Sequence, residues 1–545
     1  MNRSLGYRAP LLWLVLPLLA GLALGRMGDF APVRWQLAGA LVAAVGAVVA
    51  SWRAERWWGP ALCMALLLAG SASYALHRAR LPVWDALPPR EVRVALRVER
   101  VFARDADSPR VLGLAIITGT ESHLGEIVGQ RVYFGLNLRK GDAAPIRSAV
   151  VSTVGLLDTL PRDPPADSFD GYLAGAGVNF KLTRGRILGE EQAANTYYRF
   201  CARAAERCKA ILSLGIGTKY PELAALLRGM MLGETHELSS EQHRLFMQSG
   251  TMHLFAISGL NIGVIAAALQ IVLIFARLPA WARFVIGAAL LWLFVDITGA
   301  SPSAVRAWAM AVVLHAAFVL RRPTNPLAAV TASALAVVVI APLQVFSASF
   351  LMSYGIVFAL LVLGLPLAEA WQARWTPWRD LPEATWSMWH RSVAWAWRWA
   401  APALAIGLAT TLVGLITGVQ FFRLLTPGAL AANLVLIPAA AGVTVLGFIS
   451  LVTGLLGLGI GAVLCNHLAA WLLLAIEQLV RWSVLVPGMF VPARFTAAWV
   501  GPVTLAALLI ALGFGYAVDW KAKRGGWWPP FAIVAVALIF GVEFG

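Results

Sequence analysis

The segment SGTMHLFAISGLNIG, residues 249–263, runs directly into the apolar stretch Val264–Phe275. The second part is hydrophobic enough for a membrane helix, whereas the first holds hydroxyl, imidazole and amide groups. Polar groups at membrane depth need internal partners or a wet cavity. The pattern leaves two interpretations, of which one is a helix that starts inside a bundle and lines a polar pathway. The polar residues assigned to that pathway are Ser249, His253, Ser258 and Asn261.

Three glycines punctuate this segment, namely Gly250, Gly259 and Gly263. Glycine removes a side chain where a second helix, or a polymer in passage, comes close. The other interpretation, which residue types alone favour, is a loop that leads into a glycine-rich helix packed on its neighbours.

The composition is that of a multi-pass membrane protein. Of 545 residues, 59% are hydrophobic and 13% are charged, against about 25% charged in soluble domains. Part of the net charge of +16 is expected on the cytoplasmic side, and the remainder suits an anionic polymer or anionic lipid. The four cysteines have no zinc-site spacing, and no metal or cofactor is predicted.

The apolar runs predict a mainly α polytopic membrane protein with about 11–13 transmembrane helices. Arg3 and Arg8 place the N-terminus in the cytoplasm, and Arg53 and Arg56 in the second loop agree. Residues 1–80 therefore hold three crossings that leave the chain outside. The expected spans are 10–25, 36–51, 60–76, 253–276, 281–298, 303–320, 326–341, 347–369, 401–422, 428–455, 459–486, 501–518 and 528–544.

Residues 88–190 have the sequence pattern of a small external β domain. Glu91–Val101 alternates charged and apolar residues, and similar short segments follow at 111–118, 131–138 and 149–156. About five short strands in 100 residues predict an OB-like β-barrel. Its candidate phosphate contacts are Arg93, Arg97 and Arg131, and its few aromatic residues for base stacking are Phe102, Tyr133 and Phe134. Ordinary solvated strands are the alternative.

Residues 195–220 form a connector that contains a basic amphipathic helix, Asn195–Leu214. Such a helix lies on a membrane surface or packs on a partner, and DNA contact is the alternative. The cluster of Glu234, His236, Glu237, Glu241 and His243 that follows is interpreted as a polar surface helix, with a metal site as the alternative.

A second polar motif, TGASPSAVRA, occupies residues 298–307. Gly and Pro break a helix inside the membrane, and Ser301 and Ser303 can satisfy the freed backbone groups. Arg306 must face a cavity, a partner or the interface, and Asp296 is the expected partner. Snorkelling of Arg306 to the interface is the alternative.

Further polar residues in predicted spans complete the proposed pathway. They are Ser353, Gln420 and Asn433. Eight tryptophans in residues 371–399 are typical of an interfacial aromatic belt, and base stacking is the alternative.

Residues 249–263 and 298–307 together resemble the ComEC-type competence proteins, the inner-membrane channels for DNA uptake in natural transformation. Their motifs read roughly S-G-x-x-H-L-L-A-I-S-G-L-H-x-G and G-x-x-P-S-x-x-R-A. Asn261 stands where the family usually has a second histidine, and Leu351 replaces a usual glutamine. The segment Ser168–Val178 resembles the family's F-D-x-x-x-Y-L-x-x-x-G-I element in shortened form.

This resemblance implies that residues 221–545 are a channel domain in the cytoplasmic membrane that passes single-stranded DNA. It implies as partners membrane lipids, a DNA receptor, and cytoplasmic DNA-translocating or DNA-binding competence proteins. Many members carry a metallo-β-lactamase-like nuclease domain, but no H-x-H-x-D-H cluster and no Walker A sequence occur here. The expectation is a form without that domain, served by a separate nuclease.

Two alternatives belong to other classes of protein. A small-molecule transporter built on broken helices predicts inverted repeats, and the two halves show no convincing self-similarity. A membrane-embedded hydrolase would use His253 as a base near Ser249 or Ser258, but no orienting carboxylate has diagnostic spacing. The protein is therefore not expected to be an enzyme.

Overall fold

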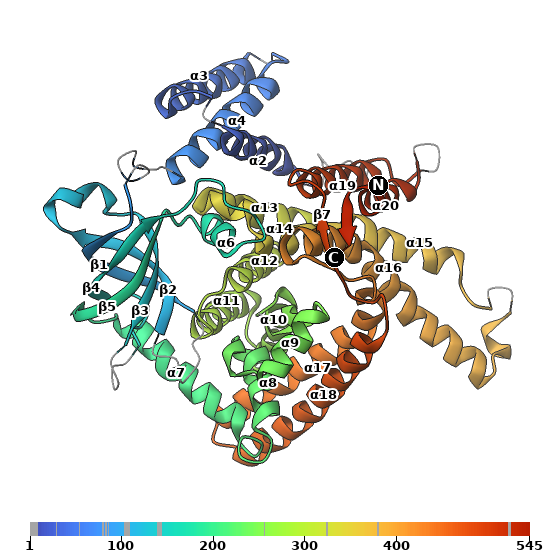
Figure 1. The fold of residues 1–545 in the computed structure, drawn as a ribbon. Helices are drawn as coiled ribbons and strands as arrows, with labels where there is room; N and C mark the ends of the chain where they lie inside the picture. Colours follow the sequence, from blue (N-terminus) through green and yellow to red (C-terminus); the bar gives the residue numbers. More distant parts are fainter. Residues whose placement is uncertain are drawn as a thin grey trace.

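The chain folds into a helical bundle with a β-barrel at one edge (Figure 1). The computed structural model describes residues 9–28, 30–53, 55–78, 81, 84, 87–102, 110–138, 144–255, 257–322, 325–378, 381–521 and 525–544. Arg3 and Arg8, from which the sequence predicts a cytoplasmic N-terminus, lie outside the described residues.

Long apolar helices dominate the bundle, as the composition predicts. Ten helices or helical runs in the described residues are long and apolar enough to span a membrane. They are α3 (Val33–Trp52), α4 (Trp58–His77), η3 with α10 (Thr251–Phe275), α11 (Ala280–Ile297), α12 (Pro302–Val319), α14 to α15 (Ala348–Arg374), α16 (Met388–Phe422), α17 (Ala429–Leu455), α18 (Gly459–Leu485) and α19 (Val500–Ala517). Shorter apolar helices are α2 (Leu12–Met27), α13 (Pro326–Ile340) and α20 (Trp528–Phe540). The predicted polytopic fold is confirmed.

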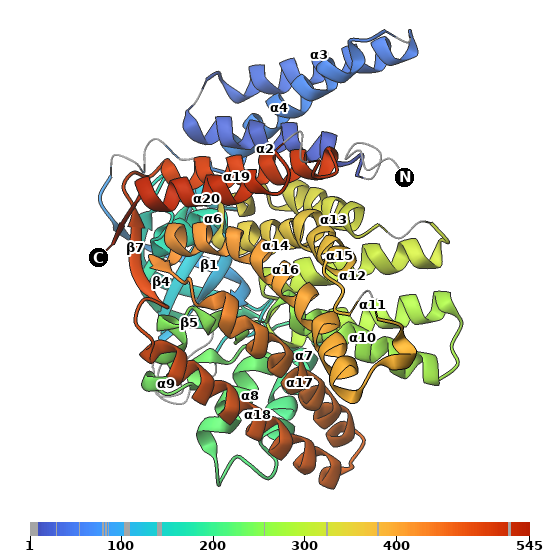
Figure 2. The same cartoon turned by 90° about the vertical axis from the view of Figure 1, so that its right-hand side faces the viewer.

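The first three helices stand beside the rest of the bundle, next to α19 and α20 (Figures 1 and 2). Glycines let α2 and α4 pack backbone to backbone. A Cβ at Gly21 would lie 2.0 Å from Leu67 O, and one at Gly70 would lie 2.4 Å from Leu18 O. Small residues provide such contacts because apolar attraction alone does not join helices in lipid.

The β domain is a closed five-stranded barrel in the order β1-β2-β3-β5-β4. Its strands are β1 (Arg90–Val101), β2 (Arg110–Thr120), β3 (Arg131–Asn137), β4 (Val150–Thr159) and β5 (Phe180–Gln192). Strand β1 closes the barrel by antiparallel pairing with β4, and β3 pairs parallel with β5. Inward residues such as Val92, Val94, Leu96 and Val98 alternate with exposed ones, so the predicted small barrel is confirmed.

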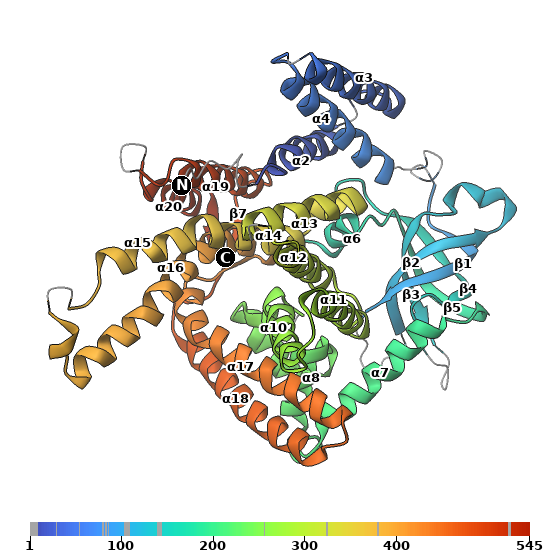
Figure 3. The ribbon, with the colours of Figure 1, turned by 180° about the vertical axis from the view of Figure 1, so that it is seen from behind.

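Two helices connect the barrel to the bundle. The short α6 (Phe169–Gly175) lies between β4 and β5 and packs on the 3₁₀ turn η4 (Pro342–Phe346). The long α7 (Thr196–Ser213) runs from the barrel to α8 (Pro221–Leu232) and contacts α11, α17 and α18. From behind, α7 visibly bridges the barrel and the α17–α18 pair (Figure 3). Helix α7 begins at Asn195, whose side chain caps it at Tyr198 N.

Three short strands that adjoin helix ends form a small antiparallel sheet. They are β6 (Leu424–Leu425), β7 (Val491–Phe495) and β8 (Val542–Phe544). These strands follow α16, precede α19 and follow α20. Because the sheet is hydrogen-bonded, all three helix ends lie on one face of the bundle. The helical run α14 to α15 contains the π-helical turn Leu360–Gly364, which leads to a projecting hairpin of α15 and α16 (Figure 1).

A candidate nucleic-acid pathway

The first motif is a sharp break between two helices. Helix α9 (Ser240–Gln248) ends at Ser249, η3 (Thr251–Leu254) follows, and α10 (Gly259–Phe275) begins after Ser258. Gly250 makes this turn with a left-handed φ of 67°, and a Cβ there would lie 3.0 Å from Thr426 Cγ2. Only glycine fits such a turn without strain. A Cβ at Gly259 would make only an ordinary 3.9 Å contact with Ala307 Cβ, and Gly263 faces open space.

The polar side chains of this motif differ in exposure. Ser249 is buried, and its Oγ donates to Phe246 O at 3.2 Å and lies 2.6 Å from Thr251 Oγ1. His253 is exposed, and its Nδ1 lies 2.9 Å from Gly250 O. Because a carbonyl only accepts, Nδ1 donates, and Nε2 of the neutral ring is left as an acceptor.

Asn261 lies inside the bundle, although the sequence assigns it to the pathway. It donates from Nδ2 to Met230 O at 3.1 Å and accepts from Thr444 Oγ1 at 3.3 Å. These bonds join α10 to α8 and α17. Ser258 stands at the helix start, where its Oγ accepts from Asn261 N.

The second motif meets the first. After α11, Gly299 and Ala300 take left-handed conformations, and Ser301 caps α12 by accepting from Ala304 N at 3.4 Å. Ser303 Oγ then donates to Ile257 O at 2.7 Å, which ties the two broken helix ends together. The carbonyl of Ile257 in the first motif thus receives a hydrogen bond from Ser303 of the second. A helix break at membrane depth requires such a partner for its free backbone groups.

Arg306 is a buried cation with neutral partners. The residue is 1% exposed, and its Nη2 donates to Ser349 O at 2.7 Å and to Ser349 Oγ at 2.6 Å. Its Nη1 lies 3.5 Å from Gln344 Oε1, the ring centroid of Tyr354 lies 6.0 Å from Cζ, and Nε is buried without a hydrogen-bond partner. A guanidinium held in this way at membrane depth is costly to bury.

The expected pairing of Arg306 with Asp296 is wrong. The Asp296 carboxylate faces the barrel side and accepts from Arg147 Nη1 at 2.8 Å and from Tyr197 OH at 2.8 Å. Burial, together with this bond to Asp296, raises the pKa of Tyr197. Asp296 is the single acidic residue of α11, and its bonds dock α7 and the loop before β4.

The other predicted pathway residues come from three further helices. Ser353 is partly buried on α14. Gln420 packs at the contact of α16 with α19, where a Cβ at Gly501 would lie 1.8 Å from its Oε1. Asn433 on α17 has a buried Oδ1 without a hydrogen-bond partner. The structure thus brings the two motifs together but places Gln420 at a separate helix contact.

The barrel arginines have different roles. Arg93 and Arg97 are exposed on β1. Arg131 binds Glu99 through Nε at 2.7 Å and Nη2 at 3.2 Å, and it donates to Ala176 O, so its guanidinium holds β3 against β1 and α6. Phe134 is fully buried in the barrel core and offers no face for stacking.

The predicted polar cluster gathers Glu234, His236 and Glu237, whose potential ligand atoms lie within 4.8 Å of one another. Their carboxylates pair with cations, Glu234 with Lys209 at 2.7 Å and Glu237 with Arg228. These ion pairs hold η2 (Thr235–Glu237) against α7 and α8.

Comparison with known proteins shows which family the chain resembles. The chain aligns with ComE operon protein 3 of Bacillus subtilis (strain 168), with 24% identity over 199 residues. The aligned region covers 36% of this chain and 25% of that protein, so the chain spans about a quarter of the curated relative's length. No solved structure matches. The family model described as "Competence protein" matches residues 230–521, more than half of the chain, and includes both motifs. The chain therefore belongs to the competence protein family.

Proposed function

We propose that this protein is a conduit for single-stranded DNA across the cytoplasmic membrane during natural transformation. Membership of the competence family supports a role in DNA uptake. The observation that carries the proposal is the junction of the two motifs. There, Ser303 joins the broken helix ends, and Arg306 stands buried one turn further along with neutral partners.

The chemistry of this junction suits a polymer of phosphodiesters. Arg306 supplies positive charge in a region where charge is scarce, and its bonds to Ser349 and Gln344 are replaceable by phosphate oxygens. A single cation binds weakly, which a conduit needs in order to release its cargo. His253, exposed beside the junction, presents Nε2 as a further polar contact.

Each part of the fold has its own role in this proposal. Residues 88–190 capture DNA outside the cell, residues 195–220 hold the barrel to the bundle, and residues 221–545 form the conduit. Residues 1–80 pack beside it in the lipid. Partners are a DNA receptor outside, membrane lipids, and cytoplasmic DNA-translocating or DNA-binding proteins that pull the strand. A separate nuclease would remove the strand that is not imported.

The decisive experiment is transformation of a competent host that lacks its own channel. We expect the wild-type chain to restore uptake, while Arg306→Gln and His253→Ala reduce transformants at least about tenfold at equal membrane levels. Arg306→Lys keeps the charge but loses the fork that binds Ser349, and it should retain part of the activity. Arg391→Gln, an exposed arginine on the projecting hairpin, is the matched control.

Three outcomes contradict the proposal. Full transformation activity of the Arg306→Gln variant would show that the buried cation has no role in the pathway. Failure of the wild type, even when a nuclease is supplied in trans, removes the conduit itself. Transport of a small solute that both variants abolish, without DNA uptake, supports the transporter alternative. A hydrolase is disfavoured because Ser249, a candidate nucleophile, is buried and its Oγ already donates to Phe246 O.

A further inference from the structure

Helix α7 carries a row of arginines on the side that faces away from the bundle. Arg199, Arg203 and Arg207 stand four residues apart and are exposed, whereas Cys201 and Cys208 are buried. Residues four apart lie one above the other on a helix, so the three guanidinium groups form one row, here called the arginine stripe. Helix α7 contacts α8, α11, α17 and α18, and its buried residues show that it does so with the opposite face.

The charge of the arginine stripe is not used in ion pairs. In the described part of the chain, no carboxylate pairs with any of its three guanidinium groups. Arg199 Nη2 donates to Thr196 Oγ1 at 3.5 Å, and Arg203 Nε donates to Arg199 O at 3.4 Å, so both bonds are long and go to neutral acceptors. The neighbouring Glu206 pairs with Lys209 at 3.0 Å. Because a guanidinium has five N–H donors, most donors of the stripe are left to solvent.

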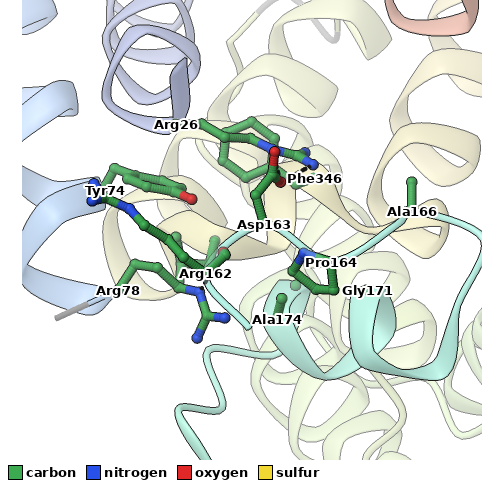
Figure 4. A pocket seen from close by; sticks show the side chains of 12 residues that line it. Arg26, Tyr74, Arg78, Arg162, Asp163, Pro164, Ala166, Gly171, Ala174 and Phe346 are labelled. Carbon is green, nitrogen blue, oxygen red and sulfur yellow. Dashed lines mark hydrogen bonds and ion pairs between the residues drawn. The ribbon is translucent and has the colours of Figure 1, made fainter. Parts of the chain in front are cut away.

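Other arginines near the barrel are used in structural contacts. Arg26 and Arg78 line the pocket shown in Figure 4, and Arg26 pairs there with Asp163 at 2.6 Å. Arg78 donates from Nη1 to Val178 O at 2.6 Å and to Asn179 Oδ1 at 2.7 Å. These bonds hold α2 and the end of α4 against the segments that follow β4 and precede β5. The arginine stripe makes no such contact, which leaves its charge available to a ligand.

Helix α7 lies between the barrel and the first motif. It follows directly on β5, and its far end contacts α8, whose Met230 O accepts from Asn261 of the first motif. With 18 residues the helix is about 27 Å long. Figure 3 shows it as the bridge between the barrel and the α17–α18 pair. The arginine stripe therefore covers the distance between the domain that captures DNA and the helices around the junction.

Two observations favour a nucleic acid over lipid headgroups as the anion. Cations that set topology or bind anionic lipid collect on the cytoplasmic side, whereas α7 follows the barrel, which we place outside the cell. In addition, Phe200 is 50% exposed on the same face as the arginines. An exposed aromatic ring within a basic surface is the composition on which bases of single strands stack.

The spacing of the arginine stripe also suits a single strand. Residues four apart are separated by about 6 Å along a helix axis. This separation is close to the distance between neighbouring phosphates of an extended single strand. Three successive phosphates can therefore each meet one guanidinium, which binds phosphate oxygens through two parallel N–H donors.

We propose that the arginine stripe of α7 binds the phosphate backbone of single-stranded DNA on its way from the barrel to the first motif. A base of the same strand stacks on Phe200. The inference rests on the proposed function for the identity of the cargo. It gives α7 a second role besides its connection of barrel and bundle, and it requires no base sequence, since the contacts are to phosphates.

The test measures binding of fluorescent oligo(dT) to the full chain in phosphatidylcholine nanodiscs over a series of salt concentrations. Neutral lipid keeps headgroup charge out of the measurement. The stripe variant combines three changes, Arg199→Gln, Arg203→Gln and Arg207→Gln. The matched control removes the same charge from exposed arginines elsewhere, by Arg322→Gln, Arg374→Gln and Arg391→Gln.

We expect the stripe variant to bind oligo(dT) at least about tenfold more weakly than the wild type. The slope of log K against log salt concentration should become shallower by about 2, because three phosphate contacts at about 0.7 each are lost. The control should keep the wild-type slope, and lysine at all three stripe positions should keep most of it, since the charge remains. If the stripe variant does not fold, Arg203→Gln alone decides, with an expected change in slope of about 0.7.

Phe200→Leu tests the stacked base separately. The change keeps apolar volume but removes the ring, so it should weaken binding of oligo(dT) and leave binding of an abasic oligonucleotide of equal length unchanged. Equal weakening of both ligands would remove the base contact from the proposal.

An unchanged affinity and salt slope in the stripe variant overturns the proposal, and so does an equal loss in the matched control. Intact oligo(dT) binding, with loss of the thermal stabilisation by phosphatidylglycerol nanodiscs, assigns the arginine stripe to lipid headgroups instead. Transformation assays separate the two proposals. Full uptake by the stripe variant defeats the role of α7 only, whereas stripe-dependent binding by a wild type that restores no uptake defeats the conduit only.

Discussion

At the residue scale, two of the buried charges of the bundle, Asp296 and Arg306, have different surroundings. Asp296 precedes the second motif and Arg306 lies within it, yet the two do not bind each other. Asp296 is satisfied by a cation and a phenol, which makes it a structural group. Arg306 keeps neutral partners and an unbonded Nε, which leaves its charge available. A buried charge that lacks a counterion is the one to test for function.

The Asp296 contact yields a stability prediction. Arg147→Gln leaves a carboxylate whose side chain is 1% exposed without its cation, and it should lower the free energy of unfolding by about 3 kcal/mol. Adding Asp296→Asn removes the stranded charge and should recover most of that loss. Thermal unfolding of the purified chain in detergent measures both variants, with Arg186→Gln as control. An Arg147→Gln chain as stable as the wild type would show that this contact does not dock the barrel.

At the scale of single elements, α7 is held at both ends by side chains of the bundle. Its start is tied to Asp296 through Tyr197. Near its end, Asn466 on α18 donates to Ile211 O at 2.8 Å and to Leu214 O at 3.0 Å. The last carbonyls of a helix have no intrahelical partner, so a fully buried asparagine supplies their hydrogen bonds. Because both of its ends are hydrogen-bonded to the bundle, the basic amphipathic helix α7 forms a fixed connection, here called the strut, between barrel and bundle.

Asn466→Leu tests this strut. The change keeps the volume but removes the bonds to the carbonyls of Ile211 and Leu214 and to the hydroxyl of Ser450. The loss of these bonds should cost about 1 kcal/mol or more of stability. Asn433→Leu is the matched control, since its buried Oδ1 already has no partner and its loss should cost less. Denaturation midpoints of the two variants give the comparison. Equal midpoints would mean that the bonds to α7 contribute nothing to stability.

At the scale of the whole molecule, the helix order and the charges together favour one orientation in the membrane. The sheet β6-β7-β8 collects helix ends on one face. Because the helices alternate in direction, the turns that hold Arg277, Arg321, Arg322, Arg374 and Lys521 lie at the opposite ends of their helices. Cytoplasmic loops are enriched in such cations, which supports an external barrel and an external sheet.

Cysteine labelling checks this orientation. In a chain with Cys63, Cys201, Cys208 and Cys465 replaced by serine, Arg186→Cys on the barrel should react with a membrane-impermeant maleimide in intact spheroplasts. Arg321→Cys, after α12, should react only after permeabilisation. Labelling of both sites from the same side would contradict the alternation of the helices.

The local patterns of the sequence determined the spans, four barrel strands and both motifs. Apolar length and period-two alternation are properties of contiguous residues, so they are readable without the fold. The sequence pattern does not reveal the fifth strand, Phe180–Gln192, because most of its second half is exposed, so that its alternation fades. The resemblance of two short motifs sufficed for the family.

Only the tertiary structure decided which polar groups meet. Asp296 binds a residue 149 positions away rather than its neighbour in sequence, because the docking of the barrel brings Arg147 to the end of α11. Asn261 and Ser249 are buried, whereas His253 is exposed, although all three belong to one motif. Phe169 and Tyr172 form a cluster with Tyr133 only because α6 folds back on the barrel. Such contacts depend on how elements pack and tilt, which no local pattern specifies.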